Sequence, residues 1–167
     1  MFNKKPIETT KAATGIERIE QLVREHLSDA DDETRQLVVA IAGLLASVTH
    51  VDRVYAQAEQ AHVREVLGNV EGLSQAGVEA ICAVLDQHGV EIAAGSSQQY
   101  TRALCELAEP ELRREVLQTL VDLAAADGEL SLAETDLLRR TTNALALSQD
   151  DYVAAQSRHR ERLSVLK

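Results

Sequence analysis

The chain has 167 residues, of which 45% are hydrophobic, and a formal net charge of −10 from 17 basic and 27 acidic side chains. Such a negative field repels polyanions, so it excludes nucleic acid as the main partner, whereas cations are attracted. Only three tyrosines and one phenylalanine are aromatic, so aliphatic side chains must build the core, which favours packed helices over a β-sandwich. We therefore predict an all-α fold.

Apolar residues recur at helical spacing along most of the chain and predict about eight helices and no strand. Residues 1–14 lack this spacing and are predicted to form a flexible N-terminal tail, and residues 15–167 a single helical domain. The expected helices cover about 16–27, a segment that ends near 49, then 56–68, 74–88, 98–108, 110–126, 131–145 and 149–166.

Proline and glycine mark two of these boundaries. Pro110 lies at the first position of its helix, where its missing N–H costs nothing. Gly89 is expected to be the C-cap of the helix before it, and residues 89–97 are predicted to link the two halves of the chain.

The segment from Leu37 to Ala46, LVVAIAGLLA, is apolar around most of its circumference and is predicted to be the central helix. It is too short to span a bilayer, which takes roughly 20 residues. The N-terminal MFNKKPIETTKAATG lacks the apolar core of a signal peptide. We expect a soluble, cytoplasmic protein that does not insert into a membrane. Cys82 and Cys105 are expected to be buried free thiols, with a single disulfide as the less favoured alternative.

Two halves of the chain, about 34–88 and 110–166, resemble each other at a shift of 75 positions. With one gap, the LSQ at 73–75 also matches the LSQ at 147–149. The pattern predicts a duplicated helical hairpin whose two acidic turns face each other. The matching positions in and after these turns are Asp52 with Asp127, Ala58 with Ala133, Glu59 with Glu134, and Arg64 with Arg139.

The second acidic turn has two interpretations. Asp127 lies where a helix should end, beside the partial negative charge of its C-terminus, which a bound cation would make favourable. In the structural interpretation, Gly128 takes a left-handed conformation, and Ser131 and Glu134 form a capping box. In the functional interpretation, four carboxylates supply oxygen ligands to a hard divalent cation, Ca²⁺ or Mg²⁺ rather than Zn²⁺. These four are Asp52, Glu59, Asp127 and Glu134.

The first turn differs in a way that keeps both interpretations open. Ala56 stands at the position of Ser131 and cannot cap through its side chain, yet Glu59 is still present. Glu59 and His62 form a Glu-x-x-His pair, but di-iron bundles need two such motifs, so we expect His62 to be a packed or boundary histidine. No nucleophile motif or glycine-rich phosphate loop is present, so we expect no enzymatic activity.

The stretch ADGELSLAETDLLRR, preceded by LVDLAA and followed by ALALSQDDYVAA, resembles the second repeat of the tellurite-resistance TerB family. The resemblance covers roughly residues 15–165, and the two ends are similar to a small stand-alone bacterial branch. The first copy, VDRVYAQAE, keeps Asp52 and Glu59 but has Arg53 and Val54 in place of the glycine and the following acid.

The resemblance implies an all-α fold, a divalent-cation site at the acidic turns, and a stress-response role exercised through other proteins. A purely structural helical adaptor, in which the turns are only caps, is the alternative.

Overall fold

The computed structural model describes residues 13–51, 57–95, 97–128 and 130–165, and this part of the chain contains eight α-helices and no strand. The all-α prediction is therefore confirmed. The helices are α1 (Gly15–His26), α2 (Asp32–Thr49), α3 (Gln57–Gly68), α4 (Gln75–Ala94), α5 (Gln98–Leu107), α6 (Pro110–Ala124), α7 (Leu132–Ala144) and α8 (Gln149–Val165).

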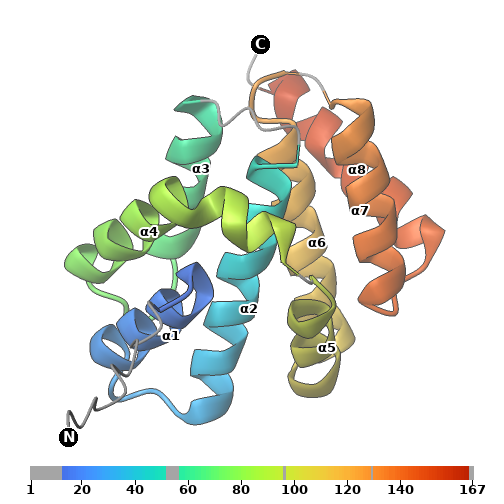
Figure 1. The fold of residues 1–167 in the computed structure, drawn as a ribbon. Helices are drawn as coiled ribbons and strands as arrows, with labels where there is room; N and C mark the ends of the chain where they lie inside the picture. Colours follow the sequence, from blue (N-terminus) through green and yellow to red (C-terminus); the bar gives the residue numbers. More distant parts are fainter. Residues whose placement is uncertain (1–12, 52–56, 96, 129, 166–167) are drawn as a thin grey trace, which may run out of the picture.

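Helix α2 is the centre of the molecule, as its apolar sequence predicts (Figure 1). It contacts α1, α4, α5, α6 and α7. Leu44 and Leu45 are at most 1% exposed, and the helix is buried on almost every side from Ala42 to Thr49. Because burial of an aliphatic side chain contributes about 1.5–3 kcal/mol, α2 supplies a large share of the driving force for folding.

The helices of the two halves keep the register that the sequence repeat predicts. Helix α2 ends at Thr49 and α6 ends 75 positions later at Ala124, and α3 begins at Gln57 and α7 again 75 positions later at Leu132. Across the halves, α3 contacts α6 and α7 contacts α2. The second helix of each pair thus packs on the first helix of the other pair, and the two halves share one core.

Helices α2 and α6 lie in contact and run in the same direction, so their C-terminal ends lie at the same end of the molecule (Figure 1). The helices that follow them, α3 and α7, begin at this end. The parallel arrangement therefore places the α2–α3 connection and the α6–α7 connection at the same end of the molecule.

Side-chain caps explain several helix starts. Thr14 and Glu17 form a capping box at α1, and the Oδ1 of Asp31 accepts the amide of Thr34 at 2.7 Å at α2. The hydrogen bonds from Thr34 hold the pKa of the Asp31 carboxyl below its ordinary value. Ser74 caps α4 in the same way, by accepting the amide of Gly77 at 3.1 Å.

The predicted end of α4 was wrong. The helix continues through Gly89 to Ala94, Gly95 is the C-cap, and most of the predicted linker is helical. Gly89 is buried, and a Cβ atom added to it would clash with the imidazole ring of His50 at the end of α2. The glycine is therefore needed for the close approach of α4 to α2 rather than to end a helix.

The predictions for Pro110 and for the free thiols are confirmed, except that one of the two cysteines is not buried. Pro110 occupies the first position of α6. Cys82 and Cys105 are free thiols, but only Cys82 is buried, since Cys105 is partly exposed with its Sγ 3.3 Å from the carbonyl oxygen of Ala144. None of the described helices combines the length and the apolar character needed to cross a bilayer.

The contact of Gly89 with His50 makes a direct prediction. Gly89→Ala should lower the free energy of unfolding by about 1–3 kcal/mol, because the added methyl group overpacks the α2–α4 contact. Gly68→Ala is the matched control, since nothing lies within 4 Å of a Cβ atom built there. Urea unfolding followed by circular dichroism measures both; equal stability of the two variants would contradict this role of Gly89.

Candidate functional site

The turn after α6 has the backbone conformation that its sequence predicts. Gly128 has a φ of 107°, in the left-handed region that favours glycine, and its amide donates to the carbonyl of Ala125 at 3.0 Å. Asp127, just before it, is exposed. The glycine thus reverses the chain between α6 and α7 and leaves the aspartate at the surface.

The predicted capping box at the start of α7 is confirmed. The Ser131 Oγ accepts the amide of Glu134 at 3.1 Å, and the Glu134 Oε1 accepts the amide of Ser131 at 3.1 Å. Glu134 is nevertheless only 2% exposed, although a capping glutamate can satisfy the same bonds at a surface. The box accounts for one carboxylate oxygen of Glu134 and not for the depth of its burial.

Glu59 occupies the equivalent position in the first turn of α3 and is 3% exposed. A buried carboxylate is costly unless partners compensate for the water that it loses. Two glutamates are therefore buried at the same register, one in each half of the chain. Asp52 and Ala56, which belong to the turn before α3, lie outside the described residues.

The four predicted ligands thus have different surroundings. The structure buries Glu59 and Glu134 and exposes Asp127. Within the described ranges, no group of three His, Cys, Asp or Glu side chains is arranged to hold a metal ion. Because Asp52 falls outside those ranges, the four-carboxylate site stays a prediction.

The helix ends near this site are electrostatically negative. Neither α2 nor α6 carries a basic residue in its last turn, whereas α1 ends with Arg24 and His26. The free carbonyl groups at a helix C-terminus carry about half a negative charge. Two parallel helices that end side by side without basic residues in their last turns form a region that favours a cation.

Two histidines lie close to the first turn. His50 is 8% exposed, with its Nδ1 2.8 Å from the Thr49 Oγ1 and 3.1 Å from the Ala46 carbonyl oxygen. His62 is partly buried, as predicted for a packed or boundary histidine, with its Nδ1 3.9 Å from the Glu65 carboxylate. Its buried Nε2 has no hydrogen-bond partner in the part of the chain that the structure describes.

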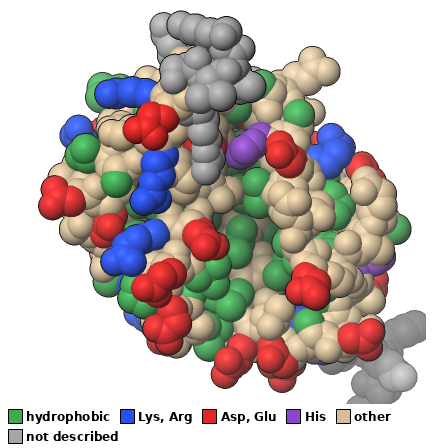
Figure 2. Space-filling model, turned by 180° about the vertical axis from the view of Figure 1, so that it is seen from behind, with side chains coloured by type: hydrophobic (Ala, Val, Ile, Leu, Met, Phe, Trp, Pro, Cys, Tyr) green, Lys and Arg blue, Asp and Glu red, His purple; other side chains and the backbone are tan. Residues whose placement is uncertain are grey.

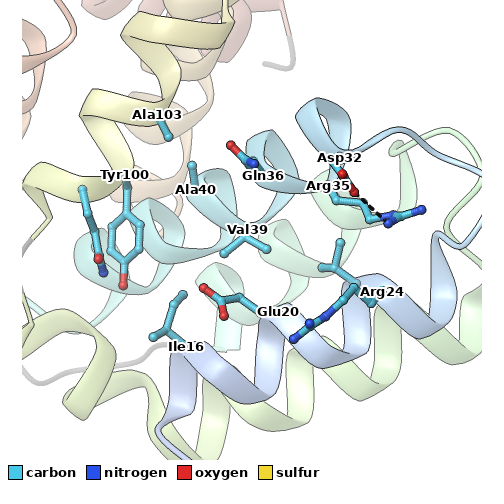
Figure 3. A pocket seen from close by; sticks show the side chains of 12 residues that line it. Ile16, Glu20, Arg24, Asp32, Arg35, Gln36, Val39, Ala40, Tyr100 and Ala103 are labelled. Atoms are coloured by element: carbon cyan, nitrogen blue, oxygen red, sulfur yellow. Dashed lines mark hydrogen bonds and ion pairs between the residues drawn. The ribbon is translucent and has the colours of Figure 1, made fainter.

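The structure also contains a groove that the sequence did not indicate. Seen from behind, the molecule has hydrophobic side chains gathered in a hollow that acidic and basic side chains surround (Figure 2). A groove of about 360 Å³ lies between α1, α2 and α5, with Ile16, Val39 and the Tyr100 ring on its walls (Figure 3). Glu20 and Arg24 of α1 flank it, and burial raises the pKa of the Tyr100 phenol above its ordinary value.

One ion pair at this groove has a structural explanation. Arg35 pairs with Asp32 at 3.1 Å and donates to the carbonyl groups of Leu27, Ser28 and Ala30 (Figure 3). These bonds fasten the turn between α1 and α2. Arg35 is therefore committed to the fold rather than to a ligand.

Comparison with known proteins agrees with the all-α fold. No curated protein and no solved structure gives a significant match. The family model described as tellurite resistance protein TerB matches residues 38–157, which include α2, α3, α6, α7 and the turn with Asp127. Because this match covers most of the sequence, the chain belongs to the tellurite-resistance TerB family.

Proposed function

We propose that the protein is a non-enzymatic, TerB-like stress-response protein that binds a divalent cation and acts through other proteins. The cation site lies where α2 and α6 end, with Asp52, Glu59, Asp127 and Glu134 as ligands. The observation that carries the proposal is the burial of Glu59 and Glu134 at equivalent positions of the two halves. Both carboxylates would attract a cation bound between the turns.

The preference for Ca²⁺ or Mg²⁺ follows from the chemistry of the proposed ligands. All four are carboxylates, and hard cations prefer oxygen ligands, whereas structural zinc sites use cysteine and histidine. Asp127, which is unfavourable beside the end of α6, becomes favourable once a cation is bound next to it.

The groove between α1, α2 and α5 supports the second part of the proposal. Its apolar walls and charged rim are of the kind that accepts an apolar side chain of a partner protein. The groove lies beside the N-terminal part of α2, from Asp32 to Ala40, and the proposed cation site lies at the C-terminal end of that helix. A partner bound in the groove would therefore leave the cation site accessible.

A helical adaptor without a metal site is the second candidate. It is favoured by the Ser131–Glu134 capping box, which gives Glu134 a structural role. In that case the acidic turns only end and start helices, and metal ions have no specific effect.

Metal titration separates the two candidates. Calorimetric titration of the full chain with Ca²⁺, Mg²⁺, Mn²⁺ and Zn²⁺ should reveal one site for Ca²⁺ or Mg²⁺ with a dissociation constant of about 10⁻⁵ to 10⁻³ M. Asp127→Asn should weaken binding roughly tenfold, because it removes a charged ligand. Asp86→Asn, on the exposed surface of α4, is the control and should leave the affinity unchanged.

Two results would contradict the cation site. One is the absence of saturable heat at millimolar concentrations of all four metals. The other is an equal loss of affinity in Asp127→Asn and Asp86→Asn, which would indicate diffuse attraction to an acidic surface.

The capping box gives a prediction that is independent of any metal. Ser131→Ala should lower the free energy of unfolding by about 1 kcal/mol in metal-free buffer, because the amide of Glu134 loses its acceptor. Ser131→Thr keeps the hydroxyl group and should stay close to the unchanged protein. Chemical unfolding of both variants measures the difference, and an alanine variant as stable as the threonine variant would refute the capping role.

A further inference from the structure

A second cavity, of about 430 Å³, lies along α6, and Arg158 of α8 also lines it. Glu115, Gln118 and Asp122 line it from α6. Residues at these spacings project from one face of a helix. The cavity therefore has a row of oxygen-bearing side chains along one wall.

The middle member of this row is a buried amide with an unused acceptor. Gln118 is 7% exposed, and its Nε2 donates to the Asp122 Oδ1 and to the Ala155 carbonyl oxygen, both at 3.0 Å. Since both partners are acceptors, the amide cannot be reversed, and its Oε1 must point away from them. That Oε1 is buried and has no hydrogen-bond partner among the described residues. An acceptor in this position can take a hydrogen bond from a bound donor.

The charges around the cavity favour a cation as that donor. Arg114 is already paired, with its Nε 3.1 Å from the Asp151 Oδ1. Asp122 contacts the Nδ1 of His159 at 2.9 Å. In all, three carboxylates (Glu111, Glu115 and Asp122) and two guanidinium groups (Arg114 and Arg158) line the cavity, and the Glu111 carboxylate lies 3.9 Å from the Arg114 Nη1. The whole chain adds a formal net charge of −10.

We propose that this cavity binds an organic ammonium group, either of a free linear polyamine or of a lysine side chain of a partner protein. The acceptors are spread along α6 from Glu115 to Asp122, a rise of roughly 10 Å, which suits amino groups separated by methylene segments. A single metal ion needs converging ligands, and the described residues contain no such group here. The alkyl portions of Arg114 and Arg158 provide apolar contacts for the methylene groups.

The Gln118 Oε1 is buried, so a ligand reaches it only when a neighbouring side chain moves. Glu115 and Arg158 are both exposed, and exposed side chains change rotamer within nanoseconds. Arg158 is also a competing cation, so its removal should strengthen binding. If the ligand binds in the cavity, removal of Arg158 should strengthen binding more than removal of an exposed arginine elsewhere. If the acidic surface only attracts cations, both removals should have the same effect.

The test is calorimetric titration of the full chain with spermidine at low ionic strength, where surface charges are least screened. We expect one saturable site. Glu115→Gln and Gln118→Met should each weaken binding at least fivefold, and Arg158→Gln should strengthen it about threefold. Glu106→Gln and Arg102→Gln, two exposed substitutions on α5, are the matched charge controls and should change the affinity by less than twofold.

Several results would overturn the proposal. They are a titration that does not saturate, effects of Glu106→Gln equal to those of Glu115→Gln, and an Arg158→Gln variant no tighter than Arg102→Gln. Circular dichroism checks the fold, and if Gln118→Met unfolds, the two exposed substitutions at the cavity still decide. Asp127→Asn should leave spermidine affinity unchanged, so the result is independent of the proposed divalent-cation site.

A lysine-containing peptide with acetylated and amidated ends distinguishes the two sources of the ammonium group. Tighter binding of spermidine assigns the cavity to a free polyamine, and tighter binding of the peptide assigns it to a protein partner. If both ligands bind and neither is displaced by an excess of the other, they do not share one cavity, and the proposal fails for the ligand whose affinity Glu115→Gln leaves unchanged.

Discussion

The structure depends on the packing of α2 against α6 in parallel. Each of these helices is the first of its half, and their aliphatic side chains, such as Leu45 and Leu120, are almost completely buried. Parallel packing places both C-terminal ends at one end of the molecule, and α3 and α7 therefore begin there too (Figure 1). An antiparallel pair would have placed the two turns at opposite ends, and no site could have used both.

Much of the fold is readable in the sequence because the relevant physics is local. Aliphatic spacing, Pro110 at a helix start, and the Ser131–Glu134 pair each act within one or two helical turns. The repeat adds information about distant parts of the chain, because matched positions must have matched surroundings. It correctly relates the ends of α2 and α6 and the starts of α3 and α7.

What could not be predicted is set by contacts between distant segments. Gly89 has the sequence context of a helix C-cap, and only the ring of His50 from another helix explains it. The groove between α1, α2 and α5 and the pairing of Asp122 with His159 likewise join residues far apart in the chain. The burial of Glu59 and Glu134 is also a tertiary property, since the Ser131–Glu134 pattern fits an exposed cap equally well and nothing in the sequence around Glu59 indicates burial.

The contact between His50 and Gly89 has a mechanical consequence. His50 is the C-cap of α2 and directly precedes the first turn. Its ring packs against the backbone of α4 at Gly89, which has no side chain to separate the two. A close-packed interior transmits displacement instead of absorbing it. Any rearrangement of the first turn would therefore displace α4 at Gly89, and α4 in turn contacts α1, α2 and α3. Because Gly89 has no side chain, His50 directly couples the end of α2 to α4 and to the helices that α4 contacts.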